Sequence, residues 1–403
     1  MASSKHTLGK LVQSFSDDDE EISFHRPLFE ISTGSYALND ALSTDGLRGG
    51  RIIQYYGPSA SGKTLMSMLA IKEAQKLNPD AYQVYIDAED TFDHNWAKKI
   101  GVFVDDEKGS HNHGVYLVAK EQAVYAERAF ELLIGRSKKD AATGLFAGKE
   151  KDGILDLVAA GEMNVNLIVL DSLGQLIFPI EATTQVGKQN MSAGARFLTT
   201  EMKKLSLAVS KANIPMIIIN HKRDNMDKYG PDHSYAGGNA YSHALSATIY
   251  FRQKGAKDEQ IFEDEKKTRK IGANIMATVE KSKFGPHPRT AEFKLHFEKG
   301  IIDPHEEISD LGIQYGVIQR LNNITYSFNG EEIKTISGLY EYFKAEDKQK
   351  LLWSKICEAR NKSLQEVTTV AAEPEPQLEG VLGALSKRKP KKVEEKKEEK
   401  TDE

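Results

Sequence analysis

The sequence predicts an α/β fold with a mostly parallel central sheet, and three observations favour it. Four short apolar segments, residues 52–56, 84–86, 167–170 and 216–219, are separated by stretches with helical periodicity. A glycine-rich loop joins the first of these strands to a helix. Residues 291–297 alternate apolar and polar side chains, as in a half-exposed antiparallel strand. We therefore expect parallel strands buried on both faces, with antiparallel strands at one end of the sheet.

Composition narrows the class of protein. The chain has 403 residues, of which 28% are charged and 39% hydrophobic, as in a globular protein. No apolar run is long enough to span a bilayer, and the polar N-terminus lacks a secretory signal, so a cytoplasmic protein without a membrane partner is expected. Cys357 is the only cysteine, which excludes a disulfide framework and a thiolate-rich metal site. The net charge of −5 indicates that any nucleic-acid site is local.

The chain divides into four expected regions. A polar N-terminal arm precedes a large core, in which residues 247–251 and 275–280 are further strands, and a small helical C-terminal lobe precedes a charged, disordered tail. Residues 136–153 interrupt the core as a surface insertion whose function the sequence does not reveal. The regions span residues 1–30, 31–303, 304–360 and 361–403.

A phosphate-binding loop follows the first strand and opens a helix. It comprises Gly57, Pro58, Ser59, Ala60, Ser61, Gly62, Lys63 and Thr64. Gly57 and Gly62 allow a tight turn, so that backbone N–H groups point at the oxygens of a polyphosphate. In this pattern Lys63 reaches the β and γ phosphates and Thr64 holds Mg²⁺. The sequence thus predicts a nucleotide and magnesium site.

Three further polar residues follow predicted strands. Glu89 is either the carboxylate that deprotonates an attacking water or a helix N-cap. Asp171 ends an apolar strand as in a Walker B segment, whose acid holds Mg²⁺ through its water. His221 either hydrogen-bonds the γ phosphate or serves a structural role. Because the carboxyl ends of parallel strands share one edge, we expect all three near the ligand crevice.

Several of these motifs occur together in the order seen in RecA-family recombinases, which the chain resembles over residues 31–303. His221 stands where bacterial RecA typically has Gln, and the Val-Glu-Lys-Ser segment at 279–282 is most similar to the UvsX branch of tailed phages. The motifs are residues 31–35, 50–52, 57–64, 85–89, 171–172, 237–240 and 279–283.

The resemblance implies a RecA-like P-loop ATPase core with ATP and Mg²⁺ as cofactors. Lys63 and Thr64 then bind ATP and Mg²⁺, Glu89 activates water and Asp171 supports the metal. Four other positions match family residues near the nucleotide: Asp93 and Trp96 beside the adenine, and Lys281 and Lys283 as a finger that reaches the γ phosphate held by the neighbouring subunit.

Two stretches, residues 180–191 and 222–236, correspond to the family's DNA-binding loops. Cations there can contact phosphate, and apolar or aromatic tips can stack on bases. A loop without a ligand is the alternative, because both stretches are only mildly basic and the second contains Asp224, Asp227 and Asp232. The candidate DNA-binding residues are Met191, Arg196, Lys203, Lys222, Arg223, Gly237, Gly238 and Asn239.

The expected function is that of a DNA-dependent ATPase in homologous recombination, repair and replication. By resemblance, it assembles as a helical filament on single-stranded DNA, pairs it with homologous duplex DNA, and works with a single-strand-binding protein and a loading mediator. If phage-encoded, it acts in the host cytoplasm. One alternative is a ring helicase on the same core, whose extra N-terminal domain has no room before Ile31. The other is a recombination mediator that holds ATP or DNA without turnover.

Overall fold

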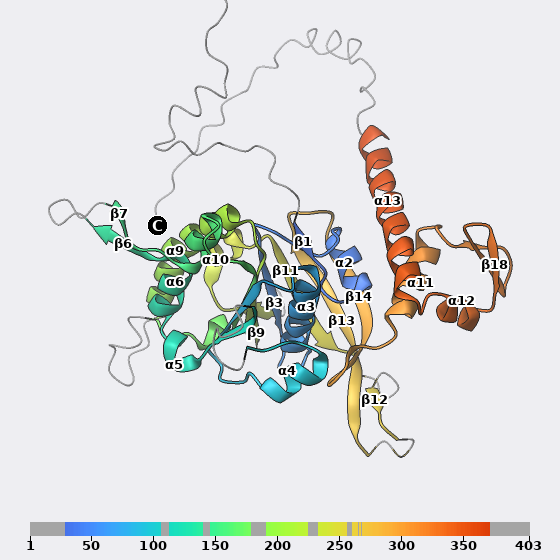
Figure 1. Ribbon diagram of the computed structural model, residues 1–403, viewed down its shortest axis with the longest axis horizontal. Coiled ribbons are helices and arrows are strands. Elements are labelled where there is room, and N and C mark those ends of the chain that lie inside the picture. The colour runs from blue at the N-terminus through green and yellow to red at the C-terminus, as the bar shows by residue number, and fades with distance from the viewer. Residues whose placement is uncertain are drawn as a thin grey trace, which may run out of the picture.

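The computed structural model describes most of the core and the C-terminal lobe (Figure 1). The described residues are 29–105, 113–139, 146–178, 191–224, 233–255, 260–264, 266 and 268–370. Within these ranges, no helix combines the length and the apolar character needed to cross a membrane.

A large sheet forms the centre of the core. Its parallel strands are β11 (Ala247–Gln253), β3 (Ile52–Gly57), β9 (Met216–Asp224), β8 (Val165–Asp171), β4 (Tyr82–Asp87) and β5 (Gly114–Val118), side by side in that order. Antiparallel strands β13 (Lys270–Ser282), β14 (Arg289–His296) and β15 (Gly300–Ile301) continue the sheet beyond β11. Two short strands, β10 (His233–Tyr235) and β12 (Gln260–Phe262), pair with β9 and β13. The predicted mostly parallel sheet with antiparallel strands at one end is confirmed.

Strand β5, at the edge of this sheet, was not predicted from the sequence. Only five residues form it, and only Gly114, Val115 and Val118 are buried, so its apolar pattern is weak. Several strands extend beyond their predicted ends, because backbone pairing with a neighbouring strand also includes polar residues. β9 extends through Asp224 in this way, since it pairs with β10.

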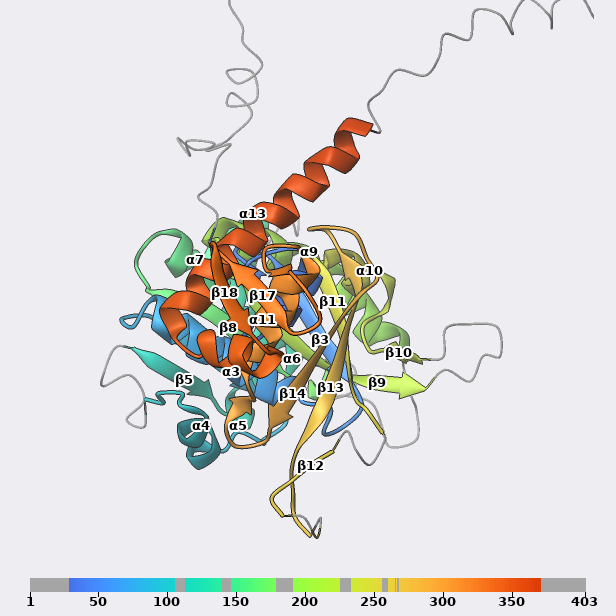
Figure 2. The ribbon, with the colours of Figure 1, turned by 90° about the vertical axis from the view of Figure 1, so that its right-hand side faces the viewer.

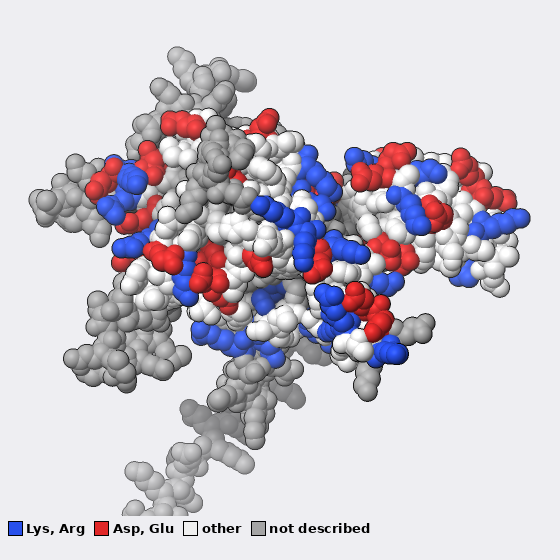
Figure 3. All heavy atoms as spheres, turned by 60° about the horizontal axis from the view of Figure 1, so that its bottom comes forward, with Lys and Arg blue, Asp and Glu red and all other residues white. Residues whose placement is uncertain are grey.

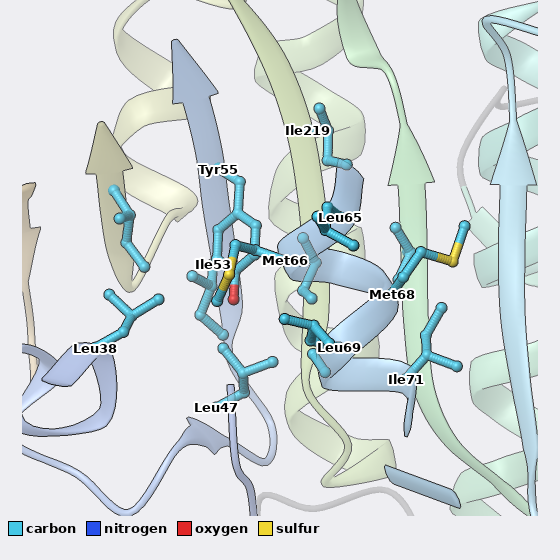
Figure 4. Packing of buried hydrophobic residues seen from close by; sticks show 14 of the residues in the cluster. Leu38, Leu47, Ile53, Tyr55, Leu65, Met66, Met68, Leu69, Ile71 and Ile219 are labelled. Atoms are coloured by element: carbon cyan, nitrogen blue, oxygen red, sulfur yellow. The ribbon is translucent and has the colours of Figure 1, made fainter. Parts of the chain in front are cut away.

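Helices cover both faces of the sheet because its strands are buried on both sides. One face packs against α2 (Tyr36–Leu42), α3 (Lys63–Leu77) and α4 (His94–Ile100), as the side chains of α3 against Ile53 and Tyr55 show in Figure 4. The other face packs against α6 (Ala126–Ile134), α7 (Ile154–Ala159), α9 (Met191–Ala212) and α10 (Gly238–Ala244). The remaining short elements are β1 (Glu30–Ile31), β2 (Leu47–Arg48), α5 (Lys120–Ala123) and η1 (Leu173–Gln175).

The interruption at residues 136–153 contains a β-hairpin. Its strands, β6 (Arg136–Lys139) and β7 (Phe146–Lys151), pair antiparallel between α6 and α7. In Figure 1 it projects from the body of the protein beside α6 and α9.

The C-terminal lobe has a hydrophobic core of its own, built around Ile308, Phe328, Phe343 and Leu352. Figure 2 shows this lobe facing the viewer, in orange and red. Its elements are α11 (Pro304–Gln314), β16 (Gln319–Arg320), β17 (Thr325–Phe328), β18 (Glu331–Lys334), α12 (Ile336–Tyr342) and α13 (Glu346–Val370). Helix α13 therefore continues past residue 361, where the charged tail is expected to begin.

A buried carboxylate, Asp40, joins α2 to the strands and to the lobe. It accepts hydrogen bonds from Arg289 at 2.6 Å and from the hydroxyl of Tyr315 at 2.7 Å. The guanidinium of Arg360 on α13 lies 3.8 Å away, and the side chains of Asp40 and Arg360 are each only 6% exposed. The carboxylate thus compensates two cations, one of which is shielded from water.

We expect Asp40→Asn to lower the free energy of unfolding by about 3 kcal/mol, because it removes the carboxylate that Arg289 and the buried guanidinium of Arg360 share, and leaves Arg360 with Asp45 at 2.9 Å, a half-exposed partner. Urea unfolding followed by circular dichroism measures the change. Glu341→Gln is the matched control, since its ion pair with Lys344 is exposed and such pairs contribute less than about 1 kcal/mol. Equal stability of the Asp40 variant and the wild type would contradict the assignment.

Candidate functional site

The loop between β3 and α3 turns tightly because two of its residues are glycine. A Cβ atom at Gly57, where φ is 152°, would lie 2.2 Å from the carbonyl oxygen of Phe251. Gly62 has a φ of 95°, in the left-handed region, immediately before the first residue of α3. The turn directs the N-terminus of a 15-residue helix toward the space enclosed by the loop, which favours an anionic ligand.

A cavity of about 290 Å³ opens beside this loop. The indole of Trp96 forms part of its wall and donates a hydrogen bond from Nε1 to the carbonyl oxygen of Phe297 at 2.6 Å. Asp93 is not part of the wall, because its carboxylate caps α4 by accepting from the N–H groups of Asn95 and Trp96. Phe297 was not predicted from the sequence, since it reaches the cavity only through the packing of the antiparallel strands. The lining residues are Ala60, Ser61, Gly62, Lys63, Thr64, Leu65, Trp96 and Phe297.

Trp96 offers a direct measure of nucleotide binding. The chain has two tryptophans, so in a Trp353→Phe variant Trp96 is the only one. We expect its fluorescence to change saturably as ATP and Mg²⁺ are added. Adding Lys63→Ala to this variant should raise the apparent dissociation constant about 10- to 100-fold, because a hydrogen bond to a charged group contributes about 1.5–3 kcal/mol. A titration unaffected by Lys63→Ala would place the nucleotide elsewhere.

Lys63 lies at the start of α3 with its ammonium folded under the loop. The ammonium donates to the carbonyl oxygens of Gly57 at 3.1 Å and Pro58 at 2.7 Å. Burial lowers the pKa of Lys63, because a charged group is less stable away from water. A phosphate oxygen entering the loop can replace these neutral carbonyl partners with a stronger, charge-assisted one.

Asp171 at the end of β8 faces the start of the same helix. Its Oδ2 accepts hydrogen bonds from Thr64 at 3.0 Å and from the hydroxyl of Tyr85 at 2.7 Å. Burial is the main cause that raises the pKa of Asp171 to about 6. The sequence analysis did not anticipate the contact with Tyr85, which depends on β4 and β8 being neighbours.

The oxygens around Thr64 and Asp171 fit a magnesium ion bound together with phosphates. Asp171 Oδ1 and Ser61 Oγ are buried and have no hydrogen-bond partner among the described residues. Among the described residues, no group of three His, Cys, Asp or Glu side chains lies close enough together to hold a metal ion. Magnesium is commonly held by one or two protein groups and completed by substrate phosphates and water, so this sparse set is suitable.

Glu89 and His221 are brought together beside the phosphate loop. Glu89 Oε1 and His221 Nε2 lie 2.7 Å apart, and β9 places His221 in register with Gly57 of β3. The hydrogen bond from His221 is the main cause that lowers the pKa of Glu89. The structure thus pairs two groups that the sequence analysis placed at the same edge without linking them. An ionised carboxylate here can accept a proton from water, and its bond to His221 fixes its orientation.

Lys281 and Lys283 lie away from the phosphate loop of their own chain. Lys281 pairs with Thr248 of β11, which pairs with Gln54 of β3, so it is about 10 Å short of Gly57 along the strand direction. The ammonium of Lys281 donates to the carbonyl oxygen of Ser242, at the far end of α10. Lys283 donates to that of His243 at 3.2 Å. Both lysines therefore point toward the opposite edge of the sheet.

The expected DNA-binding loops are only partly described. Residues 179–190, which include most of the first loop, and 225–232 of the second lie outside the described residues. The side chains of Arg196 and Lys203 on α9, and of Arg223 on β9, are exposed. Lys222 pairs with Tyr235 in the β9–β10 hairpin, and Met191 is the first residue of α9.

Helix α10 follows that hairpin directly. It begins at Gly238, and a Cβ atom at Gly237 would lie 2.4 Å from the ring of Tyr241. Asn239 is an exposed residue in its first turn. On the face shown in Figure 3, acidic and basic side chains are interspersed.

The chain is similar in sequence to RecA proteins. The model of the RecA N-terminal domain family matches residues 19–112 and 147–302. The RecA protein of Leptospira biflexa serovar Patoc is 31% identical over 304 residues, which cover 75% of this chain and 67% of the relative. That of Thioalkalivibrio sulfidiphilus is 30% identical over 312 residues (76% and 77%), and that of Pseudomonas fluorescens 30% over 304 residues (75% and 74%).

Proposed function

The chain belongs to the RecA family of recombinases, and from this premise we propose that it is a DNA-dependent ATPase that catalyses strand exchange. It assembles as a helical filament on single-stranded DNA, pairs that strand with homologous duplex DNA, and hydrolyses ATP between subunits. Head-to-tail contact between identical subunits generates a filament when the rotation does not close.

The nucleotide site supports the hydrolytic part of the proposal. Lys63 and the loop N–H groups bind the phosphates of ATP, while Thr64 and Asp171 hold Mg²⁺. Bound Mg²⁺ supplies positive charge that offsets the charge developing on the β and γ phosphate oxygens. Glu89, oriented by His221, accepts the proton of the attacking water. Trp96, in the wall of the cavity, is proposed to lie near the adenine, and the capping carboxylate of Asp93 holds the helix that carries Trp96.

The proposal depends most on one observation, the position of Lys281 and Lys283. Both ammonium groups lie at the sheet edge opposite their own phosphate loop. When one subunit stacks on the next, these ammonium groups can complete the nucleotide site of the neighbouring subunit rather than that of their own chain. Transition-state charge on the γ phosphate is then neutralised only after assembly.

The DNA interface is proposed at the β9–β10 hairpin, the start of α10 and the exposed cations of α9. Lys222, Arg223, Arg196 and Lys203 contact phosphates, while Gly237, Gly238 and Asn239 allow a strand close to the backbone. Residues 180–191, with Met191 at their end, form the second contact. Neither loop contains a base-reading module, so binding without sequence preference is expected.

We further propose that the chain belongs to the UvsX branch from tailed phages. His221 and the segment Val279, Glu280, Lys281 and Ser282 support this placement. Its place of action is then the host cytoplasm, in recombination-dependent replication and repair. A single-strand-binding protein and a loading mediator are its proposed partners.

The N-terminal arm, residues 1–30, is proposed to dock on an adjacent subunit. The small lobe and the charged tail are proposed to follow the core as separate regions.

Electron microscopy tests the function directly. The full chain is mixed with single-stranded DNA and a slowly hydrolysed ATP analogue, and phosphate release is measured in parallel with ATP. We expect helical filaments and DNA-stimulated multiple turnover. Closed rings with ATP-driven strand separation would indicate a helicase instead, and ATP binding without turnover would indicate a mediator scaffold. The absence of both filaments and DNA stimulation would refute the proposal.

A further inference from the structure

Tyr235 lies at the base of the β9–β10 hairpin, where the proposed DNA contact meets the nucleotide site. It pairs with Lys222 of β9, whose preceding residue is His221, the partner of Glu89. The base of the hairpin is also tied to the sheet, because the side-chain amide of Asn220 donates to the carbonyl oxygen of Ala236 at 2.9 Å. Because Tyr235 is the last residue of β10, a displacement of the hairpin that breaks this tie also moves Tyr235.

The hydroxyl of Tyr235 makes the first link from this hairpin toward Lys281. It donates to Ser242 Oγ on α10 at 3.3 Å. The carbonyl oxygen of that same serine accepts the hydrogen bond of the Lys281 ammonium. One residue of α10 thus joins the DNA hairpin to the lysine proposed to act on the neighbouring subunit.

The ring of Tyr235 makes a second link through β3. It lies 5.0 Å from the ring of Tyr56, centroid to centroid, in an edge-to-face arrangement. The hydroxyl of Tyr56 donates to the carboxylate of Glu280, the residue before Lys281. Tyr235 therefore contacts Ser242, which holds the ammonium of Lys281, and Tyr56, which holds the residue before it.

We propose that Tyr235 is a positioning residue that keeps Lys281 docked on α10 in the free subunit and releases it when DNA displaces the hairpin. Release lets the ammonium turn from the carbonyl oxygen of Ser242 toward the nucleotide of the adjacent subunit. This inference rests on the proposed function and adds its regulation: DNA binding makes the lysine available, so that hydrolysis follows engagement of the strand.

The first experiment measures the docking itself in the free protein, without ATP or DNA. Lysines are acetylated with limiting reagent, and the labelling rate of Lys281 is compared with that of exposed Lys203 by mass spectrometry. In Tyr235→Phe we expect Lys281 to react about fivefold faster, because the hydrogen bond from Tyr235 to Ser242 is lost and a typical hydrogen bond contributes about 1 kcal/mol. Ser242→Ala should give the same increase, and the double variant no further increase, because both substitutions break one link.

The second experiment measures its consequence for turnover. At protein concentrations at which subunits associate without DNA, we expect the ratio of DNA-stimulated to DNA-free phosphate release to fall about fivefold in Tyr235→Phe, because the released Lys281 can then reach a neighbour before DNA binds. Trp96 fluorescence should show unchanged ATP affinity. Tyr116→Phe, the same chemical change on edge strand β5, is the matched control and should leave both labelling and the ratio unaltered.

The outcomes separate this inference from the proposed function. A wild-type protein without DNA stimulation would refute the function, and that result needs no variant. A stimulated wild type whose Lys281 labelling and stimulation ratio are both unchanged by Tyr235→Phe would overturn the inference alone. If Tyr235→Phe fails to fold, as judged by thermal melting, Ser242→Ala carries the same test, because it removes the other partner of the bond.

Discussion

Glu89→Gln is expected to slow ATP hydrolysis about 10²- to 10⁴-fold, the range that general-base catalysis contributes. Glutamine has the shape of glutamate and keeps an oxygen to meet His221, which lies 2.7 Å away in the wild type. It cannot take the proton of the attacking water. The bond from His221 lowers the pKa of Glu89 and so keeps the wild-type group ionised at neutral pH, ready to act as a base.

Phosphate release in the presence of single-stranded DNA measures this effect. Trp96 fluorescence in the Trp353→Phe background shows whether ATP still binds with its original affinity. Glu127→Gln is the matched control, because Glu127 is an exposed carboxylate on α6 and its replacement should leave the rate unchanged. Normal hydrolysis by Glu89→Gln would remove this residue from the water-activating role.

Lys281→Ala is expected to abolish most DNA-stimulated hydrolysis, since a cation supplied by a neighbour is worth about 10³- to 10⁵-fold in other phosphoryl-transfer enzymes. The isolated subunit should still bind ATP normally, because Lys281 lies at the edge of the sheet opposite its own loop. Lys294→Ala, an exposed lysine on β14, is the control and should hydrolyse ATP at the wild-type rate.

Mixing two inactive variants distinguishes action on the neighbour from action within one chain. Where a Lys281→Ala subunit holds the ATP and a Glu89→Gln subunit stands next to it, the shared site contains both an intact Glu89 and an intact Lys281. The mixture should therefore recover part of the activity that each variant lacks alone. No recovery, with filaments still forming, would show that both residues serve the same chain's nucleotide.

Much of the fold follows from local patterns. Continuous apolar segments predicted the inner parallel strands, and the alternation of Ala291, Phe293 and Leu295 predicted the half-exposed antiparallel strand. Strand β5 escaped prediction because its position at the sheet edge leaves part of it exposed, which weakens the apolar signal.

The residues at strand ends were predictable individually, but their contacts were not. Glu89 meets His221 only because a single strand, β8, separates β4 from β9, and Tyr85 meets Asp171 only because β4 lies beside β8. Strand order is a property of the whole chain, and no local pattern encodes it. The same holds for Phe297, which reaches the cavity through the packing of the antiparallel strands.

Under the proposed action of Lys281 on the neighbouring subunit, the placement of Lys281 and the phosphate loop at opposite edges of one sheet would make the two ends of a filament chemically different. At one end the last subunit carries a nucleotide that no neighbour's lysine can reach, and at the other end the last lysines have nothing to act on. A filament then contains one fewer complete site than it has subunits. The incomplete end would then retain ATP longest, so that growth and loss of subunits would acquire a direction from the geometry of a single chain.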